Sequence, residues 1–313
     1  MNGFERFQKA AVIGTGMMGP GIAAILALGG VSVTVLSRKE ESAREGLAKA
    51  RSFTKLLQDN GLGGPECAEL SSSADTAATV AGCDIVIESA PENMAFKQDL
   101  FAALEESARP DAVLASNTSG LSITEIASKC RHPERVLTTH FWNPPQLMPL
   151  VEIVKGAKTS DAVAREVRAL MLHCRKVPVM VKRDTPGQLG NRLQIALQRE
   201  AMHILESGIA DVEDIDLAVK NGFGLRLPVY GVFDHLDMVG LDMFGGIFDY
   251  ITRDLSNQRG ETDGMRRMRA EGRLGAAAGR GFYDWSKRDA AETRALRDRF
   301  VLDVVKRYGN KSE

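Results

Sequence analysis

Short apolar runs alternate with longer amphipathic stretches along the first part of the chain. The runs are rich in aliphatic and β-branched residues and are bounded by glycine, proline or charged residues, which is typical of buried strands. They lie at Ala10–Ile13, Val31–Leu36, Asp84–Glu88, Ala112–Ala115, Arg135–Thr139, Leu150–Val154 and Val177–Val181. The predicted helices between them are Gly19–Leu28, Glu40–Leu57 and Phe96–Ala108. Strands separated by helices imply parallel pairing, because a parallel crossover needs a long connection.

The pattern changes at the Pro186-Gly187 step. Beyond it no strand is predicted, and the helical period of apolar positions predicts helices over Leu189–Ser207, Val212–Val219 and Ala290–Tyr308. The prediction is an α/β fold with a Rossmann-type, mostly parallel, doubly wound sheet over residues 1–184. A smaller all-α domain over residues 185–313 follows it.

Charge and cysteine usage exclude several classes of protein. The 313 residues hold 40 Lys and Arg against 41 Asp and Glu, so bulk charge does not predict a nucleic-acid partner. Aromatic residues make up 6% and are not interleaved with a basic stripe. The four cysteines are Cys67, Cys83, Cys130 and Cys174. They form no CxxC pair, which argues against a metal module or disulfide framework and favours a reducing cytoplasm.

No charged residue occurs between Lys9 and Arg38, a stretch long enough to cross a bilayer. Several glycines and Pro20 interrupt it, and it lacks the small-residue cleavage site of a secretory signal. A buried strand, a turn, a buried helix and a second strand explain the stretch better. We therefore expect no membrane segment, no targeting segment and no membrane partner.

The segment Gly14-Thr15-Gly16-Met17-Met18-Gly19 places a GxGxxG pattern between a predicted strand and a predicted helix. In this context the first glycine permits a tight turn and the second lets the backbone approach a pyrophosphate. The third lets the helix pack on the strand. The helix N-terminus adds free N–H groups for the phosphates. A plain glycine turn is the alternative, but the context favours a dinucleotide site at Gly14, Gly16, Met17, Met18 and Gly19.

The end of the second predicted strand bears on the choice of dinucleotide. NAD-binding folds usually place Asp or Glu there to accept a hydrogen bond from the ribose 2′-OH. This chain has Ser37 followed by Arg38 and Lys39. Serine and arginine suit a 2′-phosphate, whereas the alternative is that both cations are solvated and the cofactor is NAD. NAD and NADP both stay open.

Polar residues gather at the predicted ends of the later strands, where ligands of open α/β sheets bind. His140 follows one strand, and its imidazole suits the removal of a proton from an alcohol as hydride leaves. Glu152 lies in the apolar segment LVEIV and needs a partner for its charge. A His–Glu pair would fix the imidazole tautomer. The other four histidines are expected to be structural.

Several motifs in order resemble the 3-hydroxyacyl-CoA dehydrogenase family. They begin with GTGMMGPG at Gly14–Gly21, PEN at Pro91–Asn93 with Lys97 after it, and SNTSGLSITEIA from Ser116. They continue with HFWNPPQLMPLVEIV from His140, TPGQLGNR from Thr185 and GRGFYDW from Gly279. The resemblance spans both predicted domains. It implies an NAD(P)-dependent oxidoreductase of fatty-acid metabolism that moves hydride between C3 of a 3-hydroxy substrate and nicotinamide.

The resemblance also implies roles for individual residues. His140 matches the general base, Glu152 its acidic partner, and Ser119 the serine that hydrogen-bonds the reacting oxygen. Asn191 matches the asparagine that closes the site over the substrate. The positions that match cofactor contacts are Glu92, Lys97 and Asn143. The helical domain of the family binds substrate and dimerises, so the resemblance implies a homodimer, and no metal site is expected.

Departures from the family pattern leave the substrate open. The segment Pro144–Pro149 is more similar to relatives that act on small free acids, such as L-gulonate 3-dehydrogenase and carnitine dehydrogenase. Ala276–Ala278 stand where acyl-CoA enzymes often have lysine. One candidate substrate is a 3-hydroxyacyl-CoA with its adenine nucleotide along the helix Glu40–Leu57. The other is a free 3-hydroxy acid, with candidate cations Lys220, Arg226 and Arg253.

A different class of function also stays open. Some relatives are abundant structural proteins of the lens, so a cofactor-binding, crystallin-like protein without turnover is the remaining alternative. Ser119, His140, Glu152 and Asn191 are all intact, which favours an enzyme. Trp142, beside His140, is expected either to line the site or to pack where the domains join.

Overall fold

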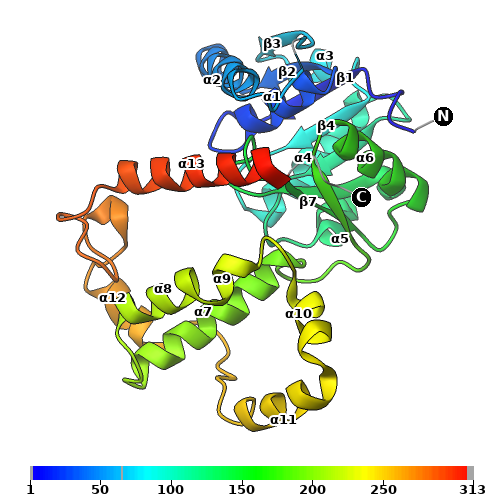
Figure 1. The fold of residues 1–313 in the computed structure, drawn as a ribbon. Coiled ribbons are helices and arrows are strands. Elements are labelled where there is room, and N and C mark those ends of the chain that lie inside the picture. The colour runs from blue at the N-terminus through cyan, green and yellow to red at the C-terminus, as the bar shows by residue number, and fades with distance from the viewer. Residues whose placement is uncertain (1–2, 65, 309–313) are drawn as a thin grey trace. The chain divides into compact units, whose positions relative to one another are not determined.

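A computed structural model of the chain describes residues 3–64 and 66–308. Contacts within the chain divide it into two compact units (Figure 1). Unit 1 comprises Met1–Asn191 and Leu296–Glu313, and unit 2 comprises Arg192–Ala295. Unit 1 thus continues past residue 184, where the sequence pattern predicts the boundary, and includes a C-terminal segment expected in the helical domain.

Unit 1 is built on one eight-stranded sheet in the order β3-β2-β1-β4-β5-β6-β7-β8. The strands are β1 (Lys9–Ile13), β2 (Ser32–Leu36), β3 (Leu70–Ser73), β4 (Ile85–Glu88), β5 (Val113–Ser116), β6 (Val136–Phe141), β7 (Leu150–Lys155) and β8 (Val177–Val181). The first six run parallel in the Rossmann order, β7 is antiparallel to β6, and β8 is parallel to β7. The predicted Rossmann-type, mostly parallel sheet is confirmed.

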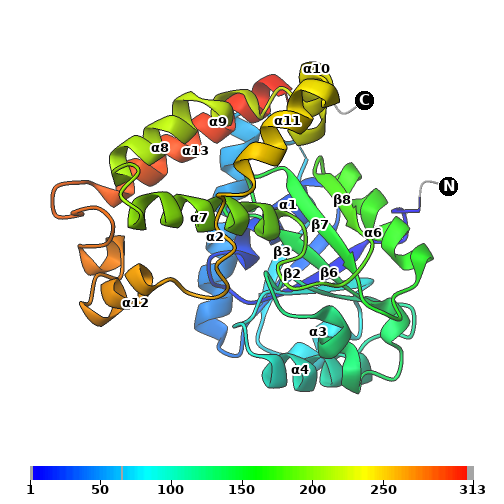
Figure 2. The same ribbon diagram turned by 90° about the horizontal axis from the view of Figure 1, so that it is seen from below.

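Residues that alternate along the strands face two separate cores. Val12, Ile87 and Leu137 belong to one core, which also holds residues of α1, α2 and α6. Ala11, Val86 and Leu114 belong to the other, which also holds residues of α3, α4 and α5. Because both faces are covered, the central strands are apolar nearly throughout, as in buried parallel sheets. The layers can be followed in Figure 2.

The helices of unit 1 fill the connections between strands. They are α1 (Gly19–Leu28), α2 (Glu40–Asp59), α3 (Thr76–Val80), α4 (Met94–Ser107), α5 (Ile123–Ile126), the 3-10 turns η1 (Ala127–Lys129) and η2 (Pro133–Arg135), and α6 (Asp161–His173). Unit 1 also includes the C-terminal half of α13 (Ala290–Tyr308), since Val301 and Leu302 pack against the first core. Lys306 Nζ in this half donates to Asn60 Oδ1 at 2.7 Å.

Unit 2 is helical. It holds α7 (Gly190–Glu206) beyond its first two residues, α8 (Val212–Asn221), α9 (Phe223–Arg226), α10 (Val232–Val239), α11 (Leu241–Ile251), α12 (Asp263–Ala270), the 3-10 turn η3 (Ala276–Ala278) and the start of α13. No residue of α8–α12 is buried within this chain. The all-α prediction for this part of the chain is confirmed, although only α7, α8 and α13 are predicted individually.

The uncharged stretch between Lys9 and Arg38 forms β1, α1 and β2, as predicted. Across the residues that the structure describes, no helix has both the length and the apolar character needed to cross a membrane.

Candidate active site

The glycines of the dinucleotide loop each meet a different steric demand. Gly14 has φ +109°, and a Cβ there would lie 2.4 Å from Ser89 O, at the end of β4. A Cβ on Gly19 would lie 1.8 Å from Gly14 O. Gly16, in contrast, has open space where its Cβ would be, as close approach of a pyrophosphate requires. The loop between β1 and α1 therefore fits a dinucleotide, beside the β1–β4 junction where the strand order reverses.

The end of β2 carries the residues that bear on the adenosine ribose. Ser37 is partly exposed, Arg38 is exposed, and neither side chain has a hydrogen-bond or ion-pair partner among the described residues. No carboxylate follows β2 at these positions. Both side chains are thus available to a 2′-phosphate.

His140 and Glu152 lie directly opposite each other on the antiparallel strands β6 and β7. His140 Nδ1 is 2.7 Å from Glu152 Oε2, and both side chains are buried. Opposed residues of an antiparallel pair project from the same face of the sheet, so the strand register itself produces the contact. The predicted pair therefore exists.

Glu152 is 0% exposed, yet both of its carboxylate oxygens are fully provided with donors. Oε2 accepts from His140 Nδ1 and from Trp142 Nε1, the latter at 3.0 Å. Oε1 accepts from the backbone N–H groups of Leu189 and Gly190, each at 2.9 Å, at the start of α7. Burial alone raises the pKa of Glu152, but these hydrogen bonds outweigh it and lower the pKa to about 2.

An ionised Glu152 fixes the tautomer of His140. A carboxylate can only accept, so Nδ1 of the imidazole must carry the hydrogen. Nε2 of a neutral His140 is then a free base, and no described residue hydrogen-bonds it. Asn117 Oδ1 accepts from Phe141 N at 2.8 Å and so anchors the end of β6 beside the imidazole.

Trp142 packs on the start of α7 as well as bonding Glu152. A Cβ on Gly190 would lie 2.4 Å from Cζ2 of the indole, so only glycine permits this approach. The ring centroids of Trp142 and His140 are 5.8 Å apart. Trp142 therefore lies both beside the His–Glu pair and against the start of α7.

Ser119 is held from two sides at the end of the segment that follows β5. Glu92 Oε1 accepts from Ser119 N at 2.7 Å and from Ser119 Oγ at 3.0 Å. Asn191 Nδ2 donates to Ser119 O at 2.8 Å. Glu92 and Asn191, two of the residues assigned by resemblance, thus both contact Ser119, a third.

Glu88, at the end of β4, is a buried acid that the sequence interpretation treated only as part of a strand. Its Oε1 lies 2.5 Å from Lys97 Nζ, and its Oε2 accepts from Ser116 Oγ at 2.7 Å. Lys97 is itself buried and lies 3.8 Å from Glu92 Oε2. The Lys97 ammonium therefore links Glu88 to Glu92, and through it to Ser119. The only sequence signal for Glu88 is that it is the acidic last residue of an otherwise apolar strand.

Comparison with known proteins identifies the family of the chain. The NAD binding domain of 3-hydroxyacyl-CoA dehydrogenase matches residues 9–185, and the C-terminal domain of the same enzyme matches residues 187–285. The chain belongs to the 3-hydroxyacyl-CoA dehydrogenase family. It is an NAD(P)-dependent oxidoreductase that acts on 3-hydroxy groups, as the sequence motifs imply.

Two relatives within this family differ in substrate. The 5-formyl-3-hydroxy-2-methylpyridine 4-carboxylate 5-dehydrogenase of Mesorhizobium japonicum is 33% identical over 302 residues, covering 95% of this chain and 97% of the relative. The mitochondrial hydroxyacyl-coenzyme A dehydrogenase of Sus scrofa is 36% identical over 290 residues, which cover 89% of this chain and 91% of the relative.

Two solved structures show the same contrast. That of the 5-formyl-3-hydroxy-2-methylpyridine 4-carboxylic acid 5-dehydrogenase, an NAD+-dependent dismutase, has a TM-score of 0.92 at 31% identity and covers 98% of this chain and 100% of its own. The structure of (S)-3-hydroxybutyryl-CoA dehydrogenase from Ralstonia eutropha has a TM-score of 0.74 at 31% identity. The match covers 90% of this chain and 100% of that one.

In this member of the 3-hydroxyacyl-CoA dehydrogenase family, the three cations expected to bind a free carboxylate already have side-chain partners within unit 2. Lys220 lies 3.3 Å from Asp216, and Arg253 pairs with Asp249 at 2.5 Å. Arg226 lies 3.3 Å from His235 Nε2. The structure therefore does not single out any of the three cations expected to bind a free carboxylate.

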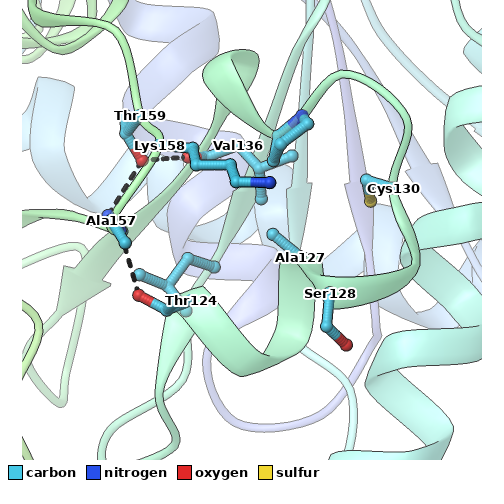
Figure 3. A pocket seen from close by; sticks show the side chains of 11 residues that line it. Thr124, Ala127, Ser128, Cys130, Val136, Ala157, Lys158 and Thr159 are labelled. Atoms are coloured by element: carbon cyan, nitrogen blue, oxygen red, sulfur yellow. Dashed lines mark hydrogen bonds between the residues drawn. The ribbon is translucent and has the colours of Figure 1, made fainter.

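A pocket opens at the other end of the sheet from His140 (Figure 3). Its walls come from α5, η1, the start of β6 and the turn that follows β7, and they include Thr124, Val136 and Thr159. Thr159 Oγ1 donates to Val136 O at 2.5 Å, and Thr124 Oγ1 accepts from Ala157 N at 3.0 Å. These hydroxyls are used internally, and the pocket lies away from the His140–Glu152 pair, so it is not part of the candidate active site.

Proposed function

We propose that His140 acts as the general base and acid of a reversible 3-hydroxy dehydrogenase. The observation that carries this proposal is the buried His140–Glu152 pair, in which Nε2 is left as a free base. Nε2 removes the proton of the C3 hydroxyl in oxidation and returns it in reduction. Glu152 keeps the tautomer correct and stabilises the imidazolium that forms. A bound nicotinamide supplies the chemistry of hydride transfer at C3.

Ser119 and Asn191 hold the substrate side of this proposed site. Ser119 Oγ, which donates to Glu92 Oε1 in the structure, would turn its hydrogen to the reacting oxygen of a bound substrate, while Glu92 and Asn191 fix the backbone of Ser119. The glycine loop with Met17 and Met18 binds the pyrophosphate. Glu92 and Asn143 contact the cofactor. Lys97, whose side chain is buried between two glutamates, contributes by holding Glu92 in place.

The family relationship favours a 3-hydroxyacyl-CoA as substrate and a role in fatty-acid metabolism. A second candidate, a small free hydroxy acid, is supported by the surface of α2, where a CoA phosphate would need cations. Arg51 there donates to Leu70 O at 3.2 Å, and Lys55 pairs with Asp59 at 3.1 Å. The higher TM-score and coverage of the pyridine-carboxylate dehydrogenase support the same candidate.

The functional assembly is proposed to be a homodimer formed through residues 185–313. Within unit 2 only Thr262 and Gly281 are buried, whereas Phe233 is 80% and Met238 is 79% exposed. Exposed apolar surface on this scale marks an interface, and a second copy of the same helices offers a complementary apolar surface. We propose the cytoplasm as its compartment, since the four cysteines are free thiols.

A panel assay tests the proposed function. Wild type and His140→Ala are assayed with NAD(H) and NADP(H) for reduction of acetoacetyl-CoA and oxidation of free L-gulonate, carnitine and 3-hydroxybutyrate. We expect turnover of at least one substrate, with kcat lowered about a hundredfold or more in His140→Ala. Preference for the thioester or for the free acids identifies the substrate class. Near-normal turnover of His140→Ala would refute the general base, and no hydride transfer with any compound would favour a crystallin-like role.

A further inference from the structure

Lys176 is a buried lysine without a carboxylate partner. It is 5% exposed, and it forms no ion pair with any residue that the structure describes. Its Nζ instead donates to two backbone carbonyls, Pro145 O at 2.7 Å and Met148 O at 2.8 Å. Burial lowers the pKa of Lys176 to about 7, partly offset by the neighbouring Cys174 thiol. This contrasts with Lys97, which is equally buried but pairs with Glu88.

The local backbone directs Lys176 inward. Arg175 adopts the left-handed conformation, with φ 58°, directly after α6. Arg175 N donates to Leu172 O and Lys176 N donates to Met171 O, each at 2.9 Å. This is the hydrogen-bond pattern of a Schellman motif, with arginine where glycine is usual. The turn therefore ends α6 and turns the chain toward β8, with Lys176 fixed at the bend.

The carbonyls that Lys176 binds belong to the segment that joins the catalytic strands. Residues 142–149 connect β6, with His140, to β7, with Glu152. The segment is compact, since Leu147 N and Met148 N both donate to Pro144 O. Any movement of this connection acts on the strand ends that carry the His–Glu pair.

The same segment rests on the dinucleotide-binding helix. A Cβ on Gly21, in the first turn of α1, would lie 2.6 Å from Pro145 Cγ and 2.7 Å from Gln146 Oε1. The segment 142–149 thus contacts both the first turn of α1 and Lys176 Nζ. Asn143, the exposed residue of the segment, is the one that the family resemblance assigns to the cofactor.

We infer that Lys176 is a positioning residue for cofactor binding, which fixes the segment 142–149 in its place beside α1 by binding two of its carbonyls. The inference deepens the proposed function and rests on it. Lys176 touches neither cofactor nor substrate in this role. Without its amine, the segment keeps its sequence but loses the two bonds that fix Asn143 relative to the glycine loop.

Cofactor titration tests the inference without requiring a known substrate. NADH and NADPH fluorescence titrations are performed on wild type, Lys176→Met and Lys158→Met, the last an exposed lysine without an ion pair among the described residues. We expect Kd for the cofactor to rise about tenfold in Lys176→Met and to stay at the wild-type value in Lys158→Met. If Lys176→Met does not fold, Lys176→Gln replaces it; its amide keeps donors on a shorter side chain, so a smaller rise in Kd is expected, and an unchanged Kd overturns the inference.

A second measurement separates positioning from simple packing. Lys176→Ala is titrated with cofactor in the presence of n-butylamine or, at equal concentration, n-butanol. Recovery of affinity with the amine but not with the alcohol supports the inference, because the protonated amine can donate to both carbonyls whereas the alcohol has a single donor. Wild-type affinity in a Lys176 variant that merely melts earlier would overturn it. Failure of wild type to bind either cofactor would instead refute the proposed function.

Discussion

The two units of the chain differ in how far they bury their own apolar side chains. In unit 1, both faces of the sheet are covered and the central strands are buried throughout. In unit 2, the helices leave Leu225, Phe233 and Met238 largely exposed. Unit 1 therefore has a buried core of its own, whereas unit 2 leaves apolar surface that the proposed homodimer would cover. The candidate site residues lie in unit 1, and the proposed assembly uses the surface of unit 2.

The largest expected effect is on unit 2. Replacing Phe233 with Asp places a charge on an apolar helix face that a second copy would cover, and burying an unpaired charge is very costly. We expect wild type to sediment as a dimer of the 34.0 kDa chain and Phe233→Asp to dissociate or fail to accumulate. Leu172→Asp, on an exposed apolar residue of unit 1, serves as control and should leave the assembly intact. A wild type that is monomeric at micromolar concentration would contradict the proposed homodimer.

Replacement of Glu152, whose donors all lie within unit 1, should have the next largest effect. In Glu152→Gln, the amide no longer stabilises the imidazolium, and its orientation can fix the wrong tautomer of His140. We expect kcat to fall at least about tenfold, with the dimer and the cofactor affinity unchanged. Equal kcat values for the variant and wild type across the pH range would contradict the pair.

The same variant should change the acid stability of unit 1. The folded-state pKa of Glu152 is lowered to about 2, so its contribution to stability is present above pH 4.5 and is lost as the pH falls toward 2. Urea unfolding at several pH values should show a steeper acid loss for wild type than for Glu152→Gln. Over this pH range, the free energy of unfolding should fall by about 2–3 kcal/mol more in wild type than in Glu152→Gln.

The contrast between the units also explains which elements could be predicted. Strands such as β4 and β8 are apolar on both faces, so their sequences stand out without an alignment. β3 has the sequence LSSS at the sheet edge, where burial is incomplete, and it was not predicted. α9 to α12 were also missed. Glycines interrupt this part of the chain, and its apolar residues do not follow the one-sided pattern of a helix that packs within its own chain.

The candidate site was predictable only where side chains carry the chemistry. His140 and Glu152 could be recognised from their places at the strands, and the antiparallel register then explains their contact. The backbone donors of Leu189 and Gly190 leave no trace in residue type, although they help to keep Glu152 ionised. Lys176 could not be distinguished from a surface lysine, because its burial depends on packing by residues distant in sequence.

A smaller effect is expected in the part of α13 that belongs to unit 1. Leu302 packs against the core of unit 1, so Leu302→Ala should lower its stability by about 1–2 kcal/mol, below the cost at a fully buried site. Asp303→Ala, one position along on the exposed face, is the control. Thermal unfolding of both variants with and without NADH measures the difference. Equal melting temperatures would place this half of the helix outside the core of unit 1.

The smallest effect concerns the choice between NAD and NADP, which is also decided within unit 1. Arg38 is exposed and has no partner among the described residues, so it can bind a 2′-phosphate through charge-assisted hydrogen bonds. Arg38→Ala should then weaken NADPH binding about three- to tenfold and leave NADH binding unchanged, with the NADPH effect shrinking at high salt. Arg38→Lys keeps the charge but loses the planar guanidinium, so its affinity for NADPH should lie between those of wild type and Arg38→Ala. Clearly tighter binding of NADH than NADPH by wild type, with no response to either substitution, would show that the end of β2 selects NAD without a carboxylate.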